Sequence, residues 1–468
     1  MIELKDIKKI YFIGIGGIGM SAIARYFHAL GVPVSGYDRT RTALTRALED
    51  TGIAIHYEDD VNQAPKDVSL VVYTPAVPRE HGELNFYREN NYPVLKRSDV
   101  LKIITENAYN ICVAGTHGKT TMSTMIAHLL RDSGYGCNAF LGGISANYDT
   151  NFWSSSRNLC VVEADEFDRS FLKLSPDVAI ITAMDPDHLD IYGSDQDFKE
   201  AFTAFSSRVK EGGLLLYKYG LDLEKSATRE RYSYSLTNTN ADIHAQNVQV
   251  VNGGYEFDVV IKLKAGKTIN GCRLEMGGLH NVENAVAAIA VAQYVGINED
   301  AIRKGIASFK GVKRRFEYHV KSESQVYIDD YAHHPEELKA LLGGVKNLFC
   351  DMRSTILFQP HLYSRTRDFA EGFAESLQMA DEVILLPVYA AREKPIPQIT
   401  SEWLAEKMAM PVRVIEKEKV LDWLREDFLK REDQVGRVLI TAGAGDIDNL
   451  VEPIKNILSG NSDNSVPV

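Results

Sequence analysis

The segment ICVAGTHGKTT occupies residues 111–121 and decides how the centre of the chain folds. Its first four residues, 111–114, are apolar and predict a buried strand, and the glycine-rich stretch that follows leads into a helical pattern. A loop between a strand and a helix exposes main-chain N–H groups at the helix N-terminus, where phosphate oxygens bind. In such a loop Lys119 reaches the β- and γ-phosphates of a bound nucleotide and the Thr120 hydroxyl binds Mg²⁺. An ordinary turn with a solvated lysine is the alternative, and the flanking strand and helix favour the phosphate-binding loop.

This loop departs from the general phosphate-binding pattern at one position. That pattern would place glycine at position 113, where the chain has Val113. The loop of this chain is a shorter variant of the pattern. It restricts the protein families to which the chain can belong, and the prediction of phosphate binding stands. The residues predicted to contact the phosphates here are Gly115, Thr116, His117, Gly118, Lys119, Thr120 and Thr121.

Acidic residues follow two further predicted strands. Glu163 ends the apolar run 159–163, and the stretch 185–190, Asp-Pro-Asp-His-Leu-Asp, follows the run 178–182. Side chains at the carboxyl ends of parallel strands point into the crevice where α/β proteins bind ligands, and carboxylates there hold Mg²⁺. We therefore predict Thr120, Glu163 and His188 as metal ligands. A surface acidic turn, and a capping or core role for His188, are the alternatives.

A second glycine-rich loop, Gly14–Gly19, follows the predicted strand 10–13. Asp38 stands about 20 residues further on, a spacing typical of dinucleotide-binding folds. The pattern predicts a diphosphate at a helix N-terminus with Asp38 at a ribose or base, but NAD and a UDP-sugar both fit it. A separate phosphate-binding loop at residues 115–121 favours two different nucleotides.

Length and composition indicate a large protein without targeting features. The 468 residues predict about three domains, and 45% hydrophobic with 25% charged residues is typical of globular proteins. The net charge of −12 argues against a nucleic-acid-binding face, and no run is apolar enough to span a membrane. Five scattered cysteines lack zinc-site spacing and suggest reduced thiols, so we expect a cytoplasmic protein.

The order of predicted elements indicates an α/β protein with three domains: residues 1–107 and 313–468 are Rossmann-like, and 108–312 form a P-loop-type ATPase domain. Between about 230 and 275 the pattern suggests a small antiparallel sheet. The predicted strands are 10–13, 33–37, 53–57, 69–73, 111–114, 159–163, 178–182, 213–217, 326–328, 354–358, 382–386 and 437–441.

Seven motifs together resemble the Mur ligase family of peptidoglycan synthesis across the whole chain. They are GIGGIGMS (14–21), AGTHGKTT (114–121), EADE (163–166), DPDHLD (185–190), HNVENAVAA (280–288), RRFE (314–317) and DDYAHHP (329–335). The resemblance implies a first domain that binds a UDP-sugar, a second that binds ATP and Mg²⁺, and a third that brings an amino acid.

The resemblance also implies a set of site residues. The UDP-sugar would contact Gly14, Gly16, Gly17, Gly19, Met20, Asp38 and Thr74. ATP would also contact Asn281, Arg315 and Asp330, and the amino acid would contact His361, Arg365 and His334. Helix capping by the asparagine, a solvated linker at 313–315 and a structural role for one of the histidines 333 and 334 are the alternatives. Some members carry a basic residue where this chain has Leu362.

The activity implied is amide-bond formation driven by ATP, through an acyl phosphate, with two Mg²⁺ ions. Lys119, His188 and Arg365 would be the catalytic residues, and Arg365 suits a bidentate grip on a carboxylate. The segment 359–366, QPHLYSRT, favours UDP-N-acetylmuramate and L-alanine as the substrates. A ligase for a recycled tripeptide and, from another class, an NAD-dependent dehydrogenase are the alternatives. We expect no nucleic-acid or membrane partner, and a monomer or weak homodimer.

Overall fold

The computed structural model describes residues 3–185, 189–223, 226–228, 230–263, 266–391, 393–431 and 435–460. The chain divides into two compact units. The first unit consists of Met1–Val248, Phe257–Leu274 and Val282–Phe309. The second unit consists of Gln249–Glu256, Glu275–Asn281 and Lys310–Val468. The first unit holds both glycine-rich loops, and the second unit holds all three predicted amino-acid-binding residues.

The N-terminal sheet of the first unit has five parallel strands in the order β3-β2-β1-β4-β5. Its strands are β1 (Ile10–Ile13), β2 (Val34–Tyr37), β3 (Ala54–His56), β4 (Leu70–Tyr73) and β5 (Val94–Lys96). All four residues of the central strand β1 are buried, as its uninterrupted apolar sequence requires. Each of the four strands expected in this region is present to within one residue at either end, and β5 is a fifth.

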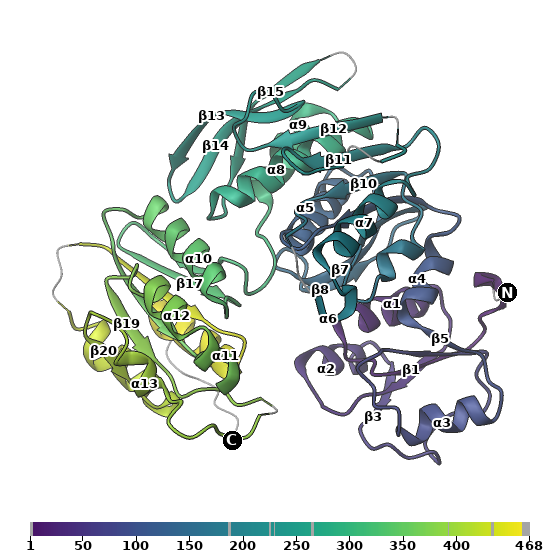
Figure 1. Ribbon diagram of the computed structural model, residues 1–468, viewed down its shortest axis with the longest axis horizontal. Helices are drawn as coiled ribbons and strands as arrows, with labels where there is room; N and C mark the ends of the chain where they lie inside the picture. Colours follow the sequence, from purple (N-terminus) through teal and green to yellow (C-terminus); the bar gives the residue numbers. More distant parts are fainter. Residues whose placement is uncertain are drawn as a thin grey trace. The chain divides into compact units, whose positions relative to one another are not determined.

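The central sheet has ten strands in the order β15-β14-β13-β12-β11-β10-β6-β9-β7-β8 (Figure 1). They are β6 (Tyr109–Ala114), β7 (Asn138–Ser145), β8 (Thr150–Trp153), β9 (Leu159–Glu163), β10 (Val178–Ile181), β11 (Leu214–Lys218), β12 (Glu230–Ser235), β13 (Ile243–Val251), β14 (Gly254–Ile261) and β15 (Lys267–Leu274). The prediction of a separate antiparallel sheet at 230–275 is wrong. These strands extend the central sheet, and β12 pairs in parallel with both β11 and β13, because an alternating pattern specifies a half-buried strand but not its neighbour.

Helices of the N-terminal and central regions are α1 (Ile18–Ala29), α2 (Ala43–Glu49), α3 (Gly82–Glu89), α4 (Arg97–Thr105), α5 (Lys119–Asp132), α6 (Leu189–Tyr192), α7 (Asp195–Ser206), α8 (Leu279–Tyr294) and α9 (Glu299–Ser308). Helix α1 contacts β1 and β2 on one side and β7 and β8 on the other. The Tyr26 ring lies 5.5 Å from that of Phe140, and the buried Asn151 amide donates to the main-chain oxygen of Ile18 at 2.6 Å. The two sheets therefore share one hydrophobic core through α1.

The second unit contains a six-stranded sheet in the order β16-β17-β21-β18-β19-β20, parallel except for the β16–β17 pair. Its strands are β16 (Glu317–Lys321), β17 (Gln325–Asp330), β18 (Arg353–Phe358), β19 (Glu382–Leu385), β20 (Val412–Val414) and β21 (Arg437–Ala442). Its helices are α10 (Pro335–Leu348), α11 (Tyr363–Asp368), α12 (Ala370–Leu377), α13 (Ser401–Ala405), α14 (Val420–Trp423) and α15 (Val451–Leu458). None of the helices described in either unit is long and apolar enough to cross a membrane.

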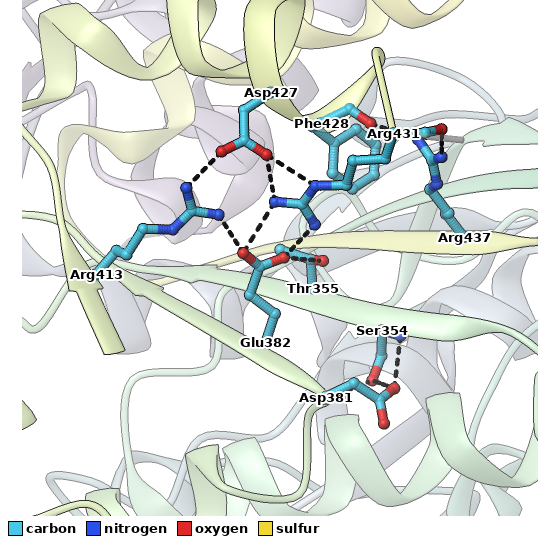
Figure 2. Close-up of polar contacts among 9 residues, drawn as sticks. All are labelled: Ser354, Thr355, Asp381, Glu382, Arg413, Asp427, Phe428, Arg431 and Arg437. Carbon is cyan, nitrogen blue, oxygen red and sulfur yellow. Dashed lines mark hydrogen bonds and ion pairs between the residues drawn. The ribbon is translucent and has the colours of Figure 1, made fainter. Parts of the chain in front are cut away.

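A network of ion pairs connects β19 and the edge strand β20 of this sheet to the segment after α14 (Figure 2). The carboxylate of Glu382, on β19, accepts hydrogen bonds from Arg431, at 2.5 Å, and from Arg413, on β20. Both guanidinium groups also bind Asp427. Although burial opposes ionisation, the bonds from Arg431 and Arg413 bring the pKa of Glu382 down to about 2. The carboxylate is therefore ionised at neutral pH, and the pairing stabilises this edge of the sheet.

Candidate nucleotide and substrate site

The phosphate-binding loop lies between β6 and α5, as expected. Gly115 has a φ of 131°, and a Cβ atom there would lie 2.1 Å from the Thr182 hydroxyl oxygen, so no other residue fits. Gly118 has a φ of 80° and forms the N-cap of α5. The Thr182 hydroxyl, beyond the end of β10, lies 2.5 Å from the main-chain oxygen of His117 and 3.2 Å from that of Ala114. The neighbouring strand end thus holds the loop in its curved form.

Lys119 is the first residue of α5, and its side chain folds back over the loop. Its amine donates to the main-chain oxygen of Gly115 at 2.6 Å and to a carboxylate oxygen of Glu166 at 2.8 Å. Glu166 is almost fully buried, and burial raises the pKa of its carboxyl group, against the opposing effect of Lys119. The lysine therefore stands at the position expected of a phosphate ligand. Its partner Glu166 is the last residue of the EADE motif (163–166), and the sequence analysis did not predict this pairing.

Glu163 ends β9, which pairs with β6 so that Glu163 lies opposite Val113, two residues before the loop begins. One of its carboxylate oxygens accepts the main-chain N–H of Gly142, on β7, at 3.1 Å. A Cβ at Gly142 would lie 2.2 Å from that oxygen, so the carboxylate rests against bare main chain. An anchored carboxylate beside a phosphate loop is the kind of oxygen donor that Mg²⁺ prefers.

The N-terminal glycine loop has the expected form, between β1 and α1. Gly14 has a φ of 84°, and a Cβ there would lie 2.8 Å from the Thr74 methyl group. The Asp38 carboxylate accepts the main-chain N–H of Gly16 at 2.7 Å and that of Thr40 at 3.1 Å. Asp38 thus shapes the loop itself, and its predicted contact with a nucleotide stays a prediction.

A cleft of ≈ 280 Å³ within the first unit lies between the end of the N-terminal glycine loop and Glu163, at the end of β9. Among the residues that line it are Gly17, Gly19, Met20, Thr74 and Glu163, which the sequence analysis assigned to two different ligands. The first turn of α1 forms one wall and the end of β9 forms another. A substrate bound at the N-terminal loop can therefore reach the carboxylate predicted to hold the metal of the ATP site.

Arg97 also lines this cleft, and the sequence analysis missed it. It is the first residue of α4, and one of its guanidinium nitrogens would lie 2.5 Å from a Cβ at Gly19. Its nearest carboxylate is that of Asp165, also in the cleft, at 3.9 Å. The Arg97 guanidinium group and the positive N-terminal end of α1 both attract anions. The cleft is therefore suited to a phosphate-bearing ligand.

The predicted ATP contacts from residue 281 onwards lie in the second unit. The Asn281 amide, in the first turn of α8, donates to the main-chain oxygen of Gly277, which precedes the helix, at 2.6 Å. Asp330 accepts the main-chain N–H groups of Phe316 and Ala332, both at 2.7 Å, and burial raises its pKa to about 6. Arg315 is exposed and interacts electrostatically with Asp330.

Three residues near this region, Glu317, His319 and Asp329, have potential metal-binding atoms within 4.8 Å of one another. The Asp329 carboxylate, however, already accepts a hydrogen bond from Arg314 at 3.0 Å and one from Thr441 at 2.7 Å. The guanidinium group supplies the positive charge that a metal ion would bring. This cluster is explained by its own ion pair, and Arg314, beside the predicted Arg315, is structural.

The predicted amino-acid residues gather after β17 and β18 in the second unit. A guanidinium nitrogen of Arg365, on α11, lies 3.4 Å from His361 Nδ1. The His361 ring stacks on Tyr389 with ring centres 5.7 Å apart and lies 6.1 Å from His333. Burial lowers the pKa of His361 and of His333, so both rings are neutral at pH 7 and leave Arg365 as the cation of the group.

Other predicted residues of these sites have different surroundings. His334 is the N-cap residue of α10, and its ring packs edge-on against Phe369 at 4.6 Å, which indicates a structural part. Leu362, at the position of a basic residue in some members, has a φ of 68°. Thr120 and Thr121 are buried in the first turn of α5. His188, predicted as a catalytic residue and metal ligand, lies outside the described residues.

Three models of the Mur ligase family match the chain: the family's catalytic domain at residues 9–109, the middle domain at 113–292 and the glutamate ligase domain at 314–445. The chain is 46% identical over 466 residues to a UDP-N-acetylmuramate–L-alanine ligase of Phocaeicola vulgatus, covering 98% of this chain and 100% of that protein. It is 47% identical to one from Porphyromonas gingivalis, covering 96% and 99%. The chain therefore belongs to the Mur ligase family.

Solved structures agree with this assignment. A UDP-N-acetylmuramate-alanine ligase of Thermotoga maritima has a TM-score of 0.79 and 28% identity, over 97% of this chain and 100% of that one. A murein peptide ligase of Psychrobacter arcticus has a TM-score of 0.66 at 20% identity, over 98% and 100%, and this second likeness shows the fold alone. The three-domain α/β architecture expected from the sequence is thus confirmed.

Proposed function

We propose that this chain is an ATP-dependent ligase that joins L-alanine to the lactyl carboxylate of UDP-N-acetylmuramate in the synthesis of peptidoglycan precursors. The observation that carries the proposal is the cleft of the first unit. It brings the N-terminal glycine loop together with Glu163, beside the phosphate-binding loop. One nucleotide-linked acid and one triphosphate can therefore meet there. The relatives that match the whole chain carry the name of this activity.

Each of the three predicted domains binds mainly one of the three substrates. Residues 1–107 bind the UDP-sugar through the glycine loop, Met20, Asp38 and Thr74, and Arg97 joins this set. Residues 108–312 bind ATP through the 115–121 loop, and residues 313–468 bring the amino acid and add Arg315 and Asp330 to the ATP site. The three sheets and the three matched segments of the chain support these boundaries.

A carboxylate does not react with an amine at neutral pH until it is activated. The lactyl carboxylate attacks the γ-phosphate of ATP, ADP leaves and an acyl phosphate forms. The neutral amine of alanine then attacks the acyl carbon, phosphate leaves and the nitrogen loses a proton. Lys119 neutralises charge on the transferring phosphoryl group, and the main-chain N–H groups of the loop hold the phosphates in line.

Mg²⁺ fits the oxygen donors of the first unit, where the Glu163 carboxylate stands at the edge of the phosphate loop. The ion would be held by Glu163 and the Thr120 hydroxyl, with His188 as a further ligand and a second ion close by. When bound, Mg²⁺ neutralises negative charge on the phosphates. Gly142 keeps the Glu163 carboxylate in its place by donating its main-chain N–H.

Arg365 binds the carboxylate of the amino acid, because its guanidinium group is the cation beside the neutral imidazole rings of His361 and His333. Since ATP and the UDP-sugar are cytoplasmic compounds, the enzyme works in the cytoplasm. Its substrates are small molecules, and no nucleic acid or membrane takes part.

Release of phosphate from ATP tests the function. The purified protein is supplied with Mg²⁺, ATP and UDP-N-acetylmuramate, together with L-alanine, with the recycled tripeptide or with no amine. Release that requires L-alanine and disappears in Lys119→Ala supports the proposal. Release with tripeptide alone would assign the chain to the recycling ligases, and release with no amine would show an ATPase.

A further inference from the structure

The ion pair between Lys119 and Glu166 has a feature that the proposed function does not use. The two charged atoms are 2.8 Å apart, and the side chains are 14% and 2% exposed. The main chain of Glu166 is fixed as well, because its carbonyl oxygen accepts the Tyr192 hydroxyl at 2.6 Å and the N–H of Arg169 at 2.9 Å. The carboxylate is thus held against the lysine by its own backbone.

The other carboxylate oxygen of Glu166 is buried and has no hydrogen-bond partner among the described residues. A buried carboxylate with one unsatisfied oxygen is costly, and its single strong contact is the lysine. Burial accordingly raises the pKa of Glu166. Moving the lysine away would leave this buried carboxylate without its one strong partner, so any ligand that takes the lysine must offset the cost of breaking the pair.

A triphosphate that enters the loop must share Lys119 with this acid. Two of the three donors of the amine are already used, by Gly115 and Glu166, and its charge is neutralised by the carboxylate. The full attraction between lysine and phosphate is available only after the amine moves away from Glu166. The acid and the nucleotide thus compete for one cation.

We propose, on the basis of the ATP-dependent function above, that Glu166 is a positioning residue that competes with the triphosphate for Lys119. It thereby limits the affinity for ATP and speeds the release of ADP. Between turnovers the Glu166 carboxylate holds the Lys119 side chain over the loop. When ADP leaves, the lysine pairs with Glu166 again.

The substitution Glu166→Gln tests this role, because it keeps the shape of the side chain and removes the charge. Calorimetry measures the Kd for ATP and for ADP, once with Mg²⁺ and once with a chelator. We expect both nucleotides to bind about three- to tenfold more tightly under both conditions, and ADP to dissociate more slowly by a similar factor. A metal ligand would instead show weaker binding, confined to the samples with Mg²⁺.

Asp165→Asn is the matched control, since it removes one negative charge from the adjacent residue. The Asp165 carboxylate accepts the N–H of Phe167 and lies 3.9 Å from Arg97, and it is 43% exposed. We expect the Kd for ATP to change less than about twofold in this variant. Equal tightening in both variants would mean that the local charge, and not competition for the lysine, is responsible.

Two further variants separate the possible outcomes. Glu166→Asp keeps the negative charge but shortens the side chain by one methylene, which weakens its contact with Lys119. We expect its Kd for ATP to lie between those of the parent and of Glu166→Gln. In a Lys119→Ala background, Glu166→Gln should leave the Kd for ATP unchanged. Suppose that the parent binds ATP and that Lys119→Ala weakens this binding. If well-folded Glu166→Gln then binds ATP no more tightly than the parent, this inference is overturned and the proposed function is not. Absence of ATP binding by the parent overturns the proposed function.

Discussion

The Thr182 hydroxyl lies 2.5 Å from the main-chain oxygen of His117 and joins the end of β10 to the middle of the phosphate-binding loop. The two residues are 65 positions apart in the chain, and the same hydroxyl lies 3.2 Å from the main-chain oxygen of Ala114. The curvature of the loop is thus set by a neighbouring strand as well as by its glycines.

Thr182→Val removes this hydroxyl while keeping the size of the side chain. We expect the Kd for ATP to rise about fivefold, since a buried hydrogen bond contributes about 1 kcal/mol and its loss leaves the loop less well ordered. Calorimetric titration measures the effect, and Thr182→Ser, which keeps the hydroxyl, is the control. Parent-like affinity in the valine variant would show that the glycines alone shape the loop.

Gly142→Ala places a methyl group where the Glu163 carboxylate now rests, 2.2 Å from one of its oxygens. The carboxylate must move, so we expect the Mg²⁺ concentration for half-maximal activity to rise roughly tenfold or more. Phosphate release titrated with Mg²⁺ gives this value. Gly343→Ala, on α10, is the matched control, because its methyl group would make only an ordinary 3.8 Å contact with Met379.

Arg97→Ala removes the cation that faces the first turn of α1. We expect the KM for the UDP-sugar to rise roughly tenfold to a hundredfold, because hydrogen bonds to charged groups contribute about 1.5–3 kcal/mol. The KM for ATP should change far less. Lys102→Ala removes an exposed cation from the same helix, α4, and should leave both values near those of the parent. An unchanged KM for the UDP-sugar would place its diphosphate elsewhere.

Arg365→Ala tests the binding of the amino acid. The KM for L-alanine should rise by about tenfold or more, while ATP binding stays close to normal. Arg367→Ala is the control on the same helix, since that guanidinium group is half-exposed and pairs with Asp368. Steady-state kinetics with varied alanine separate the two variants, and equal effects from both would argue against a specific contact by Arg365.

Glu382→Gln removes the acid at the centre of the network in Figure 2. The folded-state pKa of about 2 lies below the ordinary value of 4.5, so the ionised carboxylate stabilises the fold above pH 4.5. That contribution is lost as the pH falls from 4.5 towards 2. We expect the variant to lose roughly 1–3 kcal/mol of unfolding free energy at pH 7, and less at pH 3.

Denaturant unfolding at pH 7 and pH 3 measures this difference. Glu371→Gln is the control, because Glu371 is 83% exposed in its pair with Lys407 and should change stability little at either pH. A loss of the same size at both pH values would show that the packing of Glu382 matters and its charge does not.

Much of the fold could be predicted because its elements are local. The apolar runs of β1, β4, β9 and β18 appear where the sequence predicted them, and each glycine-rich loop has the strand and helix expected on its two sides. The 230–275 region was misread because its alternating residues define strands without saying which sheet they join. Such a choice depends on partners far away in the chain.

The sequence by itself determined the form of the two glycine loops. It also predicted roles for Lys119, for the acid at the end of β9 and for Arg365, because each belongs to a short motif whose chemistry is readable from neighbouring residues. Only the tertiary structure decided that Glu166 pairs with Lys119, that Thr182 holds the loop and that Arg97 faces Gly19. These contacts join residues 47, 65 and 78 positions apart. Strand order and helix packing bring them together, and no local pattern records that order.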